Sequence, residues 1–286
     1  MFPRILRHPK WMVLLPLLLA GSMLVAILTL GVPLSLEFSS GTLIRYEGIE
    51  ERPDVARIES SLRQLVGGEI KVEVTRDPLT GRFGLDIQTP LLGENLENQV
   101  CTLLSGLGLE NPSILPYSPA LGRAQRKQAV TAILVAALVI GLCLLFVYRK
   151  KVVLFTVPCV LLNLLAALGG MALTGTPLSL ASLAGLLLLL GYGVDTNILL
   201  ANFALKRFEG EPEERIASAM KTGFMITLTT FATMLAVNLF VTNPSLDQLS
   251  TVLLFGLGAD LLDTWFLNAG VYLHFTKKRR MYYVSL

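Results

Sequence analysis

Residues 152–194 read VVLFTVPCVLLNLLAALGGMALTGTPLSLASLAGLLLLLGYGV, a run of 43 residues without a charged side chain. As one helix this run would be about 64 Å long, at about 1.5 Å per residue, whereas the hydrocarbon core of a bilayer is about 30 Å thick. The run therefore predicts two membrane crossings. The breaker cluster Thr174-Gly175-Thr176-Pro177 near its middle predicts the turn between them.

Four further apolar runs flank this pair, at residues 11–31, 129–148, 222–241 and 249–275. Of the 286 residues, 53% are hydrophobic and 16% are charged, against about 25% charged residues in soluble domains. We therefore expect a polytopic α-helical membrane protein with six transmembrane helices. The first run has the basic start of a cleaved signal peptide, but it exceeds the roughly 7–15 apolar residues of such peptides and no clear A-x-A site follows it, which favours a retained anchor.

Lys and Arg gather on one side of the predicted spans, which is the cytoplasmic side by the positive-inside rule. These residues are Arg4, Arg7, Lys10, Arg149, Lys150, Lys151, Lys206, Arg207, Arg215, Lys221, Lys277, Lys278, Arg279 and Arg280. The exceptions, Arg123, Arg126 and Lys127, directly follow the segment that we expect to be translocated. We therefore expect a multi-pass protein of the cell membrane with both termini in the cytoplasm.

Residues 36–120 differ in charge from the rest of the chain. They carry 13 acidic and 7 basic residues, a net charge of −6, whereas the remainder has a net charge of +9. Predicted strands at 42–47, 70–75, 83–89 and 113–117 alternate with predicted helices at 54–66 and 96–107, and a turn is expected at 78–81. Two β-α-β units in series are typical of a ferredoxin-like α+β fold, so we expect one such extracytoplasmic domain between the first and second spans.

This reading divides the chain into four parts. Residues 1–35 form a cytoplasmic N-terminus and the first span, 36–122 the outer domain, 123–276 the other five spans, and 277–286 a basic cytoplasmic tail. The outer domain has no His, a single cysteine and no Ser/His/Asp or metal-ligand grouping, and the chain has no Walker A motif. We therefore expect a protein that is not an enzyme, with no catalytic residue, no bound metal, no cofactor and no nucleic-acid partner.

Three aspartates fall within the predicted spans: Asp195 in the fourth, and Asp260 and Asp263 in the sixth. Each such residue costs about 2.5–3.5 kcal/mol on insertion scales and is usually functional. In a low dielectric, a carboxyl group can take up and release a proton, or it can stay ionised against a cation or buried donors. Either behaviour can couple an ion gradient to motion.

The alternative interpretation of these carboxyl groups is structural. A permanently protonated aspartate could join helices by hydrogen bonds to Asn163, Asn197 or Asn268. Gly191 and Gly193, just before Asp195, are small residues of the kind that lets membrane helices approach closely.

The fourth predicted span resembles a known family. The sequence GYGVDTNILL at residues 191–200, preceded by PLSL at 177–180, resembles the fourth span of SecF, within the SecD/SecF family of protein-export membrane proteins and the resistance-nodulation-division superfamily. The order of one span, an outer domain, five more spans and a basic tail agrees. The match places Asp195 at the family's acidic position, and its neighbours on the motif are Gly191, Tyr192, Gly193, Thr196 and Asn197.

This resemblance implies a function in protein export. Members of the family pair with SecD and help translocated proteins to clear the SecY channel by using a proton or sodium gradient. The expected partners are therefore SecD, the SecY translocon complex, unfolded exported polypeptide and membrane lipid. The resemblance also implies a role for Asp195 in ion coupling.

Two motifs depart from the family pattern. The D-F-x-G-G motif that opens the outer domain reads EFSSG at residues 37–41, so Phe38 and Gly41 are kept and Glu37 preserves the charge. Bacterial members carry an Arg near the start of the fifth span, where this chain offers only Lys221.

The sixth span resembles the archaeal members instead. Asp260 and Asp263, followed by Asn268, look like the archaeal form of this span, which implies an archaeal-type protein whose sixth span supplies polar groups that bacteria place elsewhere. Two other functions stay open: half of a solute or lipid exporter of the same superfamily, or a passive scaffold for SecD and the translocon. Such exporters usually carry larger, paired outer domains, and the single domain here favours the SecF interpretation.

Overall fold

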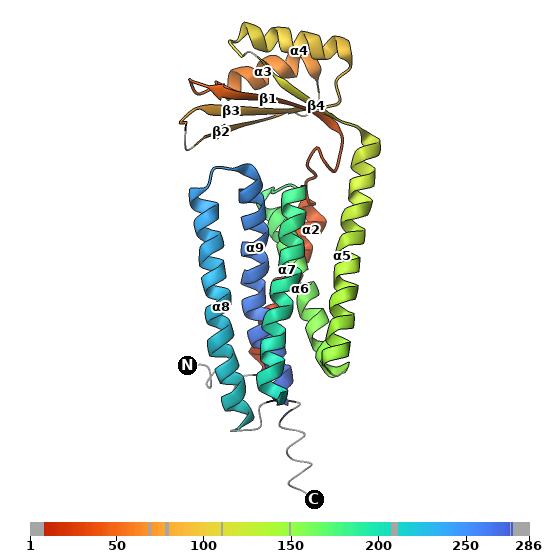
Figure 1. The fold of residues 1–286 in the computed structure, drawn as a ribbon, viewed down its shortest axis with the longest axis vertical. Coiled ribbons are helices and arrows are strands. Elements are labelled where there is room, and N and C mark those ends of the chain that lie inside the picture. The colour runs from red at the N-terminus through yellow and green to blue at the C-terminus, as the bar shows by residue number, and fades with distance from the viewer. Residues whose placement is uncertain are drawn as a thin grey trace, which may run out of the picture.

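The computed structural model describes residues 9–67, 70–77, 80–109, 111–148, 150–206, 211–274 and 276. A small α/β domain stands on one end of a bundle of long helices (Figure 1). Part of the expected turn at 78–81, the basic tail at 277–286 and several residues used for the orientation lie outside the described residues. Those orientation residues are Arg4, Arg7, Arg149, Arg207, Lys277, Lys278, Arg279 and Arg280.

Six helices in the described part of the chain are long and apolar enough to cross a membrane. They are α2 (Pro9–Leu30), α5 (Pro119–Val147), α6 (Lys150–Thr174), α7 (Leu180–Ala201), α8 (Pro212–Phe240) and α9 (Pro244–Leu262). The prediction of six apolar spans is therefore confirmed in length and composition. The predicted division of residues 152–194 is also confirmed, because α6 ends at Thr174 and Gly175 follows with a φ of 72°, a left-handed conformation that glycine adopts without strain.

Two of these helices begin well before the predicted spans. Helix α5 starts at Pro119, after Ser118, whose hydroxyl accepts a hydrogen bond from Leu121 N–H as an N-cap, whereas the apolar run starts at residue 129. Helix α8 starts at Pro212 and includes part of the segment that we expected to precede the fifth span. An apolar run shows only which part of a helix can lie in the hydrocarbon core of the bilayer. The backbone hydrogen bonds of a helix can continue beyond that run into polar sequence, so the helix begins earlier than the run.

Two helices continue as π-helix, which the sequence did not predict. Helix α7 runs into η1 (Asn202–Lys206), and α9 runs into η2 (Asp263–Asn268), which begins at one of the candidate aspartates. A π-turn widens the helix by one residue and is frequent at functional sites. Helix α9 with η2 thus presents its polar residues on a wider helix than a regular span would.

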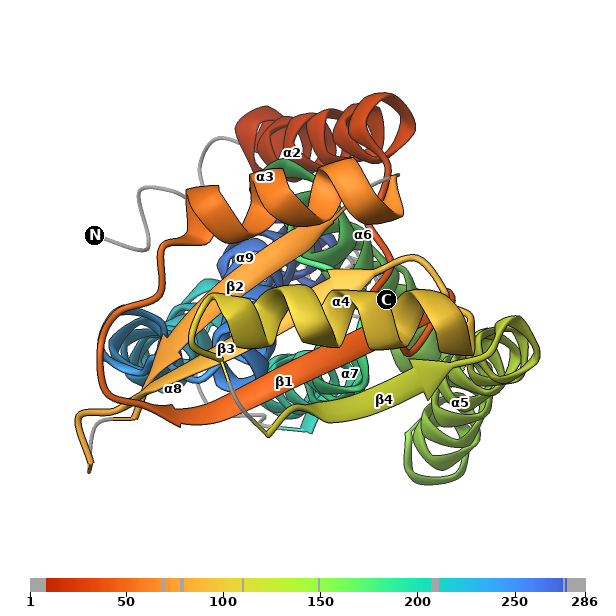
Figure 2. The same ribbon diagram turned by 90° about the horizontal axis from the view of Figure 1, so that it is seen from above.

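The outer domain contains every strand and helix predicted for it, with shifts of one or two residues at the ends. They are β1 (Gly41–Ile49), α3 (Val55–Val66), β2 (Lys71–Arg76), β3 (Phe83–Thr89), α4 (Glu94–Gly106) and β4 (Ser113–Tyr117). The sheet is antiparallel with the strand order β2-β3-β1-β4. Both helices cover the sheet face that points away from the bundle (Figures 1 and 2), and they enclose a core that includes Ile44, Leu62, Ile87 and Leu104.

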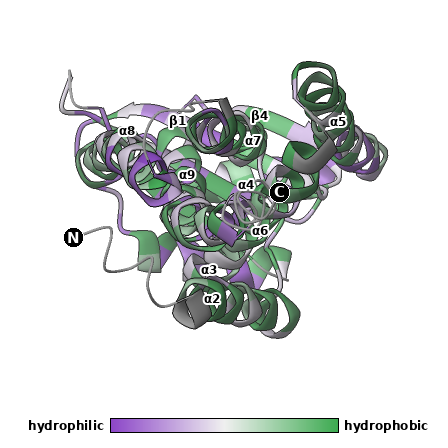
Figure 3. Ribbon diagram, turned by 90° about the horizontal axis from the view of Figure 1, so that it is seen from below, coloured by the Kyte–Doolittle hydropathy of each residue, from purple (hydrophilic) through white to green (hydrophobic). Residues whose placement is uncertain are grey.

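Helices α6, α7 and α9 form the centre of the bundle and pack against one another. Helix α2 lies against α6, α8 lies against α9, and α5 lies against α6 and α7. Seen from the end opposite the outer domain, most of the ribbon of the helices, α2 and α5 included, carries the colour of hydrophobic residues (Figure 3). A helix that is apolar all round is typical of a membrane span, since both its lipid side and its protein side avoid polar groups.

Candidate functional site

A network of buried polar side chains crosses the centre of the bundle. Its middle is the carboxyl group of Asp260 on α9, which is 0% exposed. Asp260 Oδ1 accepts three hydrogen bonds, from Asn163 Nδ2 on α6 at 2.9 Å, Thr196 Oγ1 on α7 at 3.1 Å and Thr264 Oγ1 on η2 at 2.8 Å. One carboxylate oxygen thus joins all three central helices.

Asn197 extends this network on α7. Its Nδ2 donates to the carbonyl oxygen of Gly193 at 2.7 Å and lies 3.0 Å from Thr264 Oγ1, and its Oδ1 accepts from Asn268 Nδ2. Gly193 permits this packing, since a Cβ at that position would lie 3.0 Å from Asn163 Nδ2. Of the three asparagines considered as partners of a buried aspartate, Asn163 donates to Asp260, whereas the hydrogen bonds of Asn197 and Asn268 go to each other, to Gly193 and to Thr264.

Asp263 is the second carboxyl group of this core and is 2% exposed. Its carbonyl oxygen lies 3.8 Å from the Cys159 thiol on α6. Three oxygens of the core have no hydrogen-bond partner among the described residues, namely Asp260 Oδ2, Asn163 Oδ1 and Asp263 Oδ1. Buried oxygens without partners are rare in folded proteins and call for an explanation.

Asp195 lies on the opposite side of α7 and is exposed in this chain. Four other exposed residues of α7 precede it at helical spacing, namely Leu180, Ala184, Leu188 and Tyr192. We call these five residues the open stripe of α7. Gly191 belongs to the same exposed side, because a Cβ there would have nothing within 4 Å.

The predicted site residues therefore separate into two groups. The structure brings Asp260, Asp263, Gly193, Thr196, Asn197 and Asn268 together in the core, and it leaves Asp195, Tyr192 and Gly191 on the open side of α7. Lys221 is exposed near the start of α8 and belongs to neither group. The role of Thr264 was missed, although its spacing of four residues from Asp260 places both on one helix face.

Glu37 joins the outer domain to the N-terminus of α7. Its Oε2 accepts a hydrogen bond from the backbone N–H of Leu180 at 2.8 Å. Next to it, the backbone of residues 33–35 pairs with Leu178: Leu178 N–H donates to Pro33 O at 2.8 Å and Ser35 N–H donates to Leu178 O at 3.0 Å. The segment that leads from α2 into β1 is thus tied to the start of the helix that carries Asp195.

The other two residues of this motif have packing roles. Phe38 is completely buried. Gly41 has a φ of 156°, and a Cβ there would lie 2.4 Å from the carbonyl oxygen of Thr89. Gly122 at the start of α5 is packed as closely, because a Cβ added there would lie 1.9 Å from the carbonyl oxygen of Ser39. The burial of Phe38 and the close approach of Thr89 to Gly41 explain why an apolar residue and a glycine occupy these positions.

Removing the Glu37 carboxylate should destabilise this junction. Glu37→Ala removes both an acceptor and a negative charge from a helix N-terminus, so we expect a loss of about 1 kcal/mol in the free energy of unfolding. Glu37→Gln keeps an oxygen acceptor, so its free energy of unfolding should fall by less than that of Glu37→Ala. Unfolding of the purified protein in mixed micelles measures both, with Glu51→Ala on the exposed domain surface as the control. Equal stability of Glu37→Ala and the control would mean that the bond does not support the junction.

The sheet face toward the bundle carries an ion pair. Side chains alternate along β1, and because Ile44 and Tyr46 point into the core under the helices, Arg45 points to the other face. Arg45 Nε and Nη2 donate to the two carboxylate oxygens of Asp86 on β3, each at 2.7 Å. The hydrogen bonds to Asp86 raise the pKa of Arg45.

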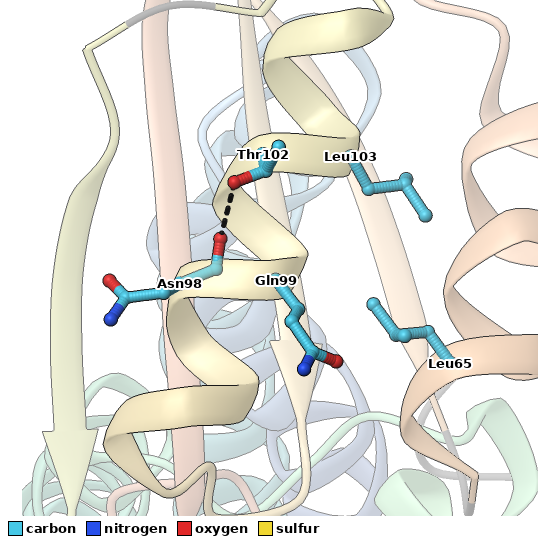
Figure 4. Close-up of a pocket in the computed structure, with 5 residues that line it drawn as sticks. All are labelled: Leu65, Asn98, Gln99, Thr102 and Leu103. Carbon is cyan, nitrogen blue, oxygen red and sulfur yellow. Dashed lines mark hydrogen bonds between the residues drawn. The ribbon is translucent and has the colours of Figure 1, made fainter.

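A shallow pocket of about 420 Å³ lies between α3 and α4 on the outer domain. Figure 4 shows its lining, which is Leu65, Asn98, Gln99, Thr102 and Leu103, with Thr102 Oγ1 donating to the Asn98 carbonyl oxygen at 2.8 Å. None of these side chains is charged. No group of three or more His, Cys, Asp or Glu that could hold a metal ion occurs within the described part of the chain.

Comparison with known proteins finds a family that covers the helix bundle. The family described as "Protein export membrane protein SecD/SecF, C-terminal" matches residues 102–278, which include α5 to η2. The chain belongs to this family, in its archaeal SecF branch. The SecF resemblance predicted from the fourth span is thereby confirmed, and the protein is a multi-pass membrane protein of the export machinery's family.

Curated SecF relatives match along most of the chain. The protein-export membrane protein SecF of Pyrococcus furiosus is 30% identical over 279 residues, covering 95% of this chain and 92% of the relative. The one from Methanopyrus kandleri is 35% identical over 246 residues, covering 85% and 86% of the two chains. These relatives bear the names of export membrane proteins rather than of enzymes.

Solved structures of SecDF share the fold. The crystal structure of SecDF from Thermus thermophilus, described as a translocon-associated membrane protein, superposes with a TM-score of 0.75 over 93% of this chain at 20% identity. A structure of SecDF in a super-membrane-facing form has a TM-score of 0.67 and covers 98% of this chain at 18% identity. This chain spans only 38% and 40% of the length of those two SecDF chains.

Proposed function

We propose that this chain is the SecF subunit of a SecD–SecF pair that assists Sec-dependent protein export by coupling a proton or sodium gradient to motion of its outer domain. In this proposal SecD and the SecY translocon complex are its partners, and unfolded exported polypeptide is its transient substrate. Both chain termini lie in the cytoplasm, and the outer domain, with the β-α-β-β-α-β order of a ferredoxin-like fold, lies outside.

The observation that carries the proposal is the exposure of Asp195. A carboxyl group within an apolar span costs up to about 2.5–3.5 kcal/mol on insertion scales, and such groups face protein or water rather than lipid. Asp195 is exposed in the isolated chain, at the end of the open stripe of α7. A second membrane protein that covers the stripe would remove this cost, and SecD is the partner that the family membership favours.

The connection at Glu37 supports a mechanical role for α7. A change of charge at Asp195 would alter the position that α7 prefers, because the helix would move to keep the charge hydrated or paired. The N-terminus of α7 is bonded to Glu37 and to the backbone of residues 33–35, which lead directly into β1. A shift of α7 therefore acts on the outer domain through hydrogen bonds rather than through a flexible tether.

The test is the isosteric change Asp195→Asn. We expect the variant to assemble normally with SecD but to slow the gradient-dependent release of exported protein by roughly tenfold or more, since a neutral amide neither binds a proton nor attracts a cation. Release from inverted membrane vesicles, with and without an ionophore, measures the effect. Asp247→Asn in the first turn of α9 is the matched control, because the amide oxygen can still accept the bond from Asn238.

Each of the open alternatives has its own outcome. Unchanged release by Asp195→Asn, with SecD still bound, would reject ion coupling at this residue and leave the passive scaffold. Purification of the chain without SecD or the translocon, but with a solute-binding partner, would favour the exporter instead.

A further inference from the structure

We propose that the end of α5 next to the outer domain binds the phosphate headgroup of an anionic phospholipid through Arg123, Arg126 and Lys127. We call these three residues the basic cluster of α5. The place of the lipid in the outer leaflet rests on the orientation given in the proposed function. The binding itself rests on the exposure, the spacing and the charge of the cluster.

The side chains of the basic cluster are exposed and have no acidic partner. Arg123, Arg126 and Lys127 are all exposed. None of them takes part in an ion pair with another described residue, and α5 itself contains no Asp or Glu. Like charges three or four positions apart on a helix repel one another, so a negatively charged ligand beside them is favoured.

The cluster continues along α5 as an exposed apolar face. Arg123, Arg126 and Lys127 are followed by Val130 and Leu134, and the spacing i, i+3, i+4, i+7 and i+11 places all five on one side of the helix. Val130 is 58% exposed and Leu134 is 64% exposed. Helix α5 stands at the edge of the bundle (Figures 1 and 2), so acyl chains can cover this face.

The position of the cluster along the helix corresponds to the headgroup layer of a bilayer. The apolar run 129–148 has 20 residues and is about 30 Å long as a helix, which equals the thickness of the hydrocarbon core. Lys127 and Arg123 lie two and six residues before this run, or about 3 and 9 Å. Since the headgroup layer extends about 5–7 Å beyond the core, the charged groups lie at the level of the lipid phosphates.

The chemistry of this face favours a phospholipid over a soluble anion. The connections 175–179 and 241–243, at the same end of the bundle, contain no Lys or Arg, so the positive charge there is confined to one helix. Arg and Lys donate charge-assisted hydrogen bonds to phosphate oxygens. The apolar residues below them suit an acyl chain, which a soluble anion does not have.

A lipid at this position also contacts the base of the outer domain. Ser118 is the single residue between the end of β4 and the start of α5. Gly122 packs against the carbonyl oxygen of Ser39, which lies in the segment before β1. A bound lipid on the next turn of α5 therefore holds the attachment of two strands at the membrane surface.

The experiment uses the purified full chain in mixed micelles with equal amounts of phosphatidylglycerol, which is anionic, and phosphatidylcholine, which has no net charge. Native mass spectrometry counts the lipids that stay bound. Phosphatidylglycerol should be retained about fivefold or more over phosphatidylcholine, the factor expected for one basic group near an anionic surface. The preference should shrink in about 0.5 M NaCl, because salt screens exposed charges. Equal retention of the two lipids overturns the proposal.

A triple variant locates the lipid. Arg123→Gln/Arg126→Gln/Lys127→Gln should retain about one phosphatidylglycerol fewer per chain than the wild type, while the basic residues at the other end of the bundle keep their own lipids. The three side chains are exposed, so the variant should fold. An unchanged number of bound phosphatidylglycerol molecules would place the lipid elsewhere and overturn the proposal.

The matched control removes the same charge from the outer domain. Arg52→Gln/Arg57→Gln/Arg63→Gln changes three exposed residues on α3 or just before it, on the sheet face that points away from the bundle. This variant should retain as many phosphatidylglycerol molecules as the wild type. Equal losses in the two triple variants would mean that net charge alone attracts the lipid, and would reject the site.

Two further outcomes would reject a lipid as the ligand. Displacement of the retained phosphatidylglycerol by soluble glycerol phosphate would show that the acyl chains do not contribute. Loss of SecD binding by the triple variant, with an unchanged lipid count, would assign the cluster to a protein interface instead. Lipid retention needs no ion gradient, so its failure is distinguishable from a failure of ion coupling at Asp195.

Discussion

Asp260→Leu is expected to lower the free energy of unfolding by about 2–4 kcal/mol, because it leaves buried donors without their acceptor. Thr196 can turn its hydroxyl to the carbonyl oxygen of Gly193, which lies 3.1 Å away. Asn163 loses the acceptor of its Nδ2, and its amide is completely buried. The stranded amide of Asn163 should therefore account for much of the loss, and unfolding in mixed micelles measures it.

The double variant Asn163→Leu/Asp260→Leu provides the sharper comparison. Replacing both partners of a buried hydrogen bond by apolar residues can leave the free energy of unfolding nearly unchanged. The double variant should therefore be more stable than Asp260→Leu by about 1 kcal/mol or more. Additive losses in the two single variants would show that Asn163 and Asp260 do not act as a pair.

Gly223→Ala is expected to destabilise the contact between α8 and η2 by about 1–3 kcal/mol, the usual cost of an overpacked core. A Cβ at this position would lie 2.0 Å from Cζ2 and 2.1 Å from Cη2 of Trp265. The Trp265 ring is 0% exposed and sits in η2, two residues after Asp263. The Trp265 ring is rigid, so the added methyl group can fit only if α8 or η2 shifts, and a shift of η2 would also displace Asp263.

Gly191→Ala is the matched control for this change, because its Cβ would have nothing within 4 Å. In the isolated chain it should be neutral or stabilising by up to about 1 kcal/mol, since alanine favours helix over glycine. Trp265→Leu in the Gly223→Ala background should recover part of the loss. Equal melting temperatures for Gly223→Ala and Gly191→Ala would argue against the close packing of α8 on η2.

The sequence was most informative about the outer domain. In that domain one sheet face is packed under helices, so apolar residues alternate with polar ones along the strands, and the amphipathic pattern of α3 marks its buried side. This contrast explains why the predicted strands and helices agree with β1 to β4, α3 and α4 within two residues. The bidentate pair of Arg45 with Asp86, in contrast, depends on the strand register, which no local pattern specified.

The junction was only partly predictable. The EFSSG motif marked residues 37–41 as important, but nothing in it indicated that Glu37 would accept a bond from Leu180, which is 143 positions away in the chain. The π-helix η2 could not be predicted from the sequence either. A π-turn arises from the packing of a helix against its neighbours rather than from a residue preference that is visible in a sequence.

By itself the sequence determined that this chain has six apolar spans, an acidic segment between the first two of them and three aspartates in the spans, because length, charge and breaker residues are visible in one dimension. Only the tertiary structure decided that Asp260 and Asp263 lie in a buried network while Asp195 lies on an open surface. In a soluble helix the contrast between polar and apolar faces reveals the buried side. In these spans lipid and protein interior are equally apolar, so every face of α7 and α9 looks alike until the helices are packed together.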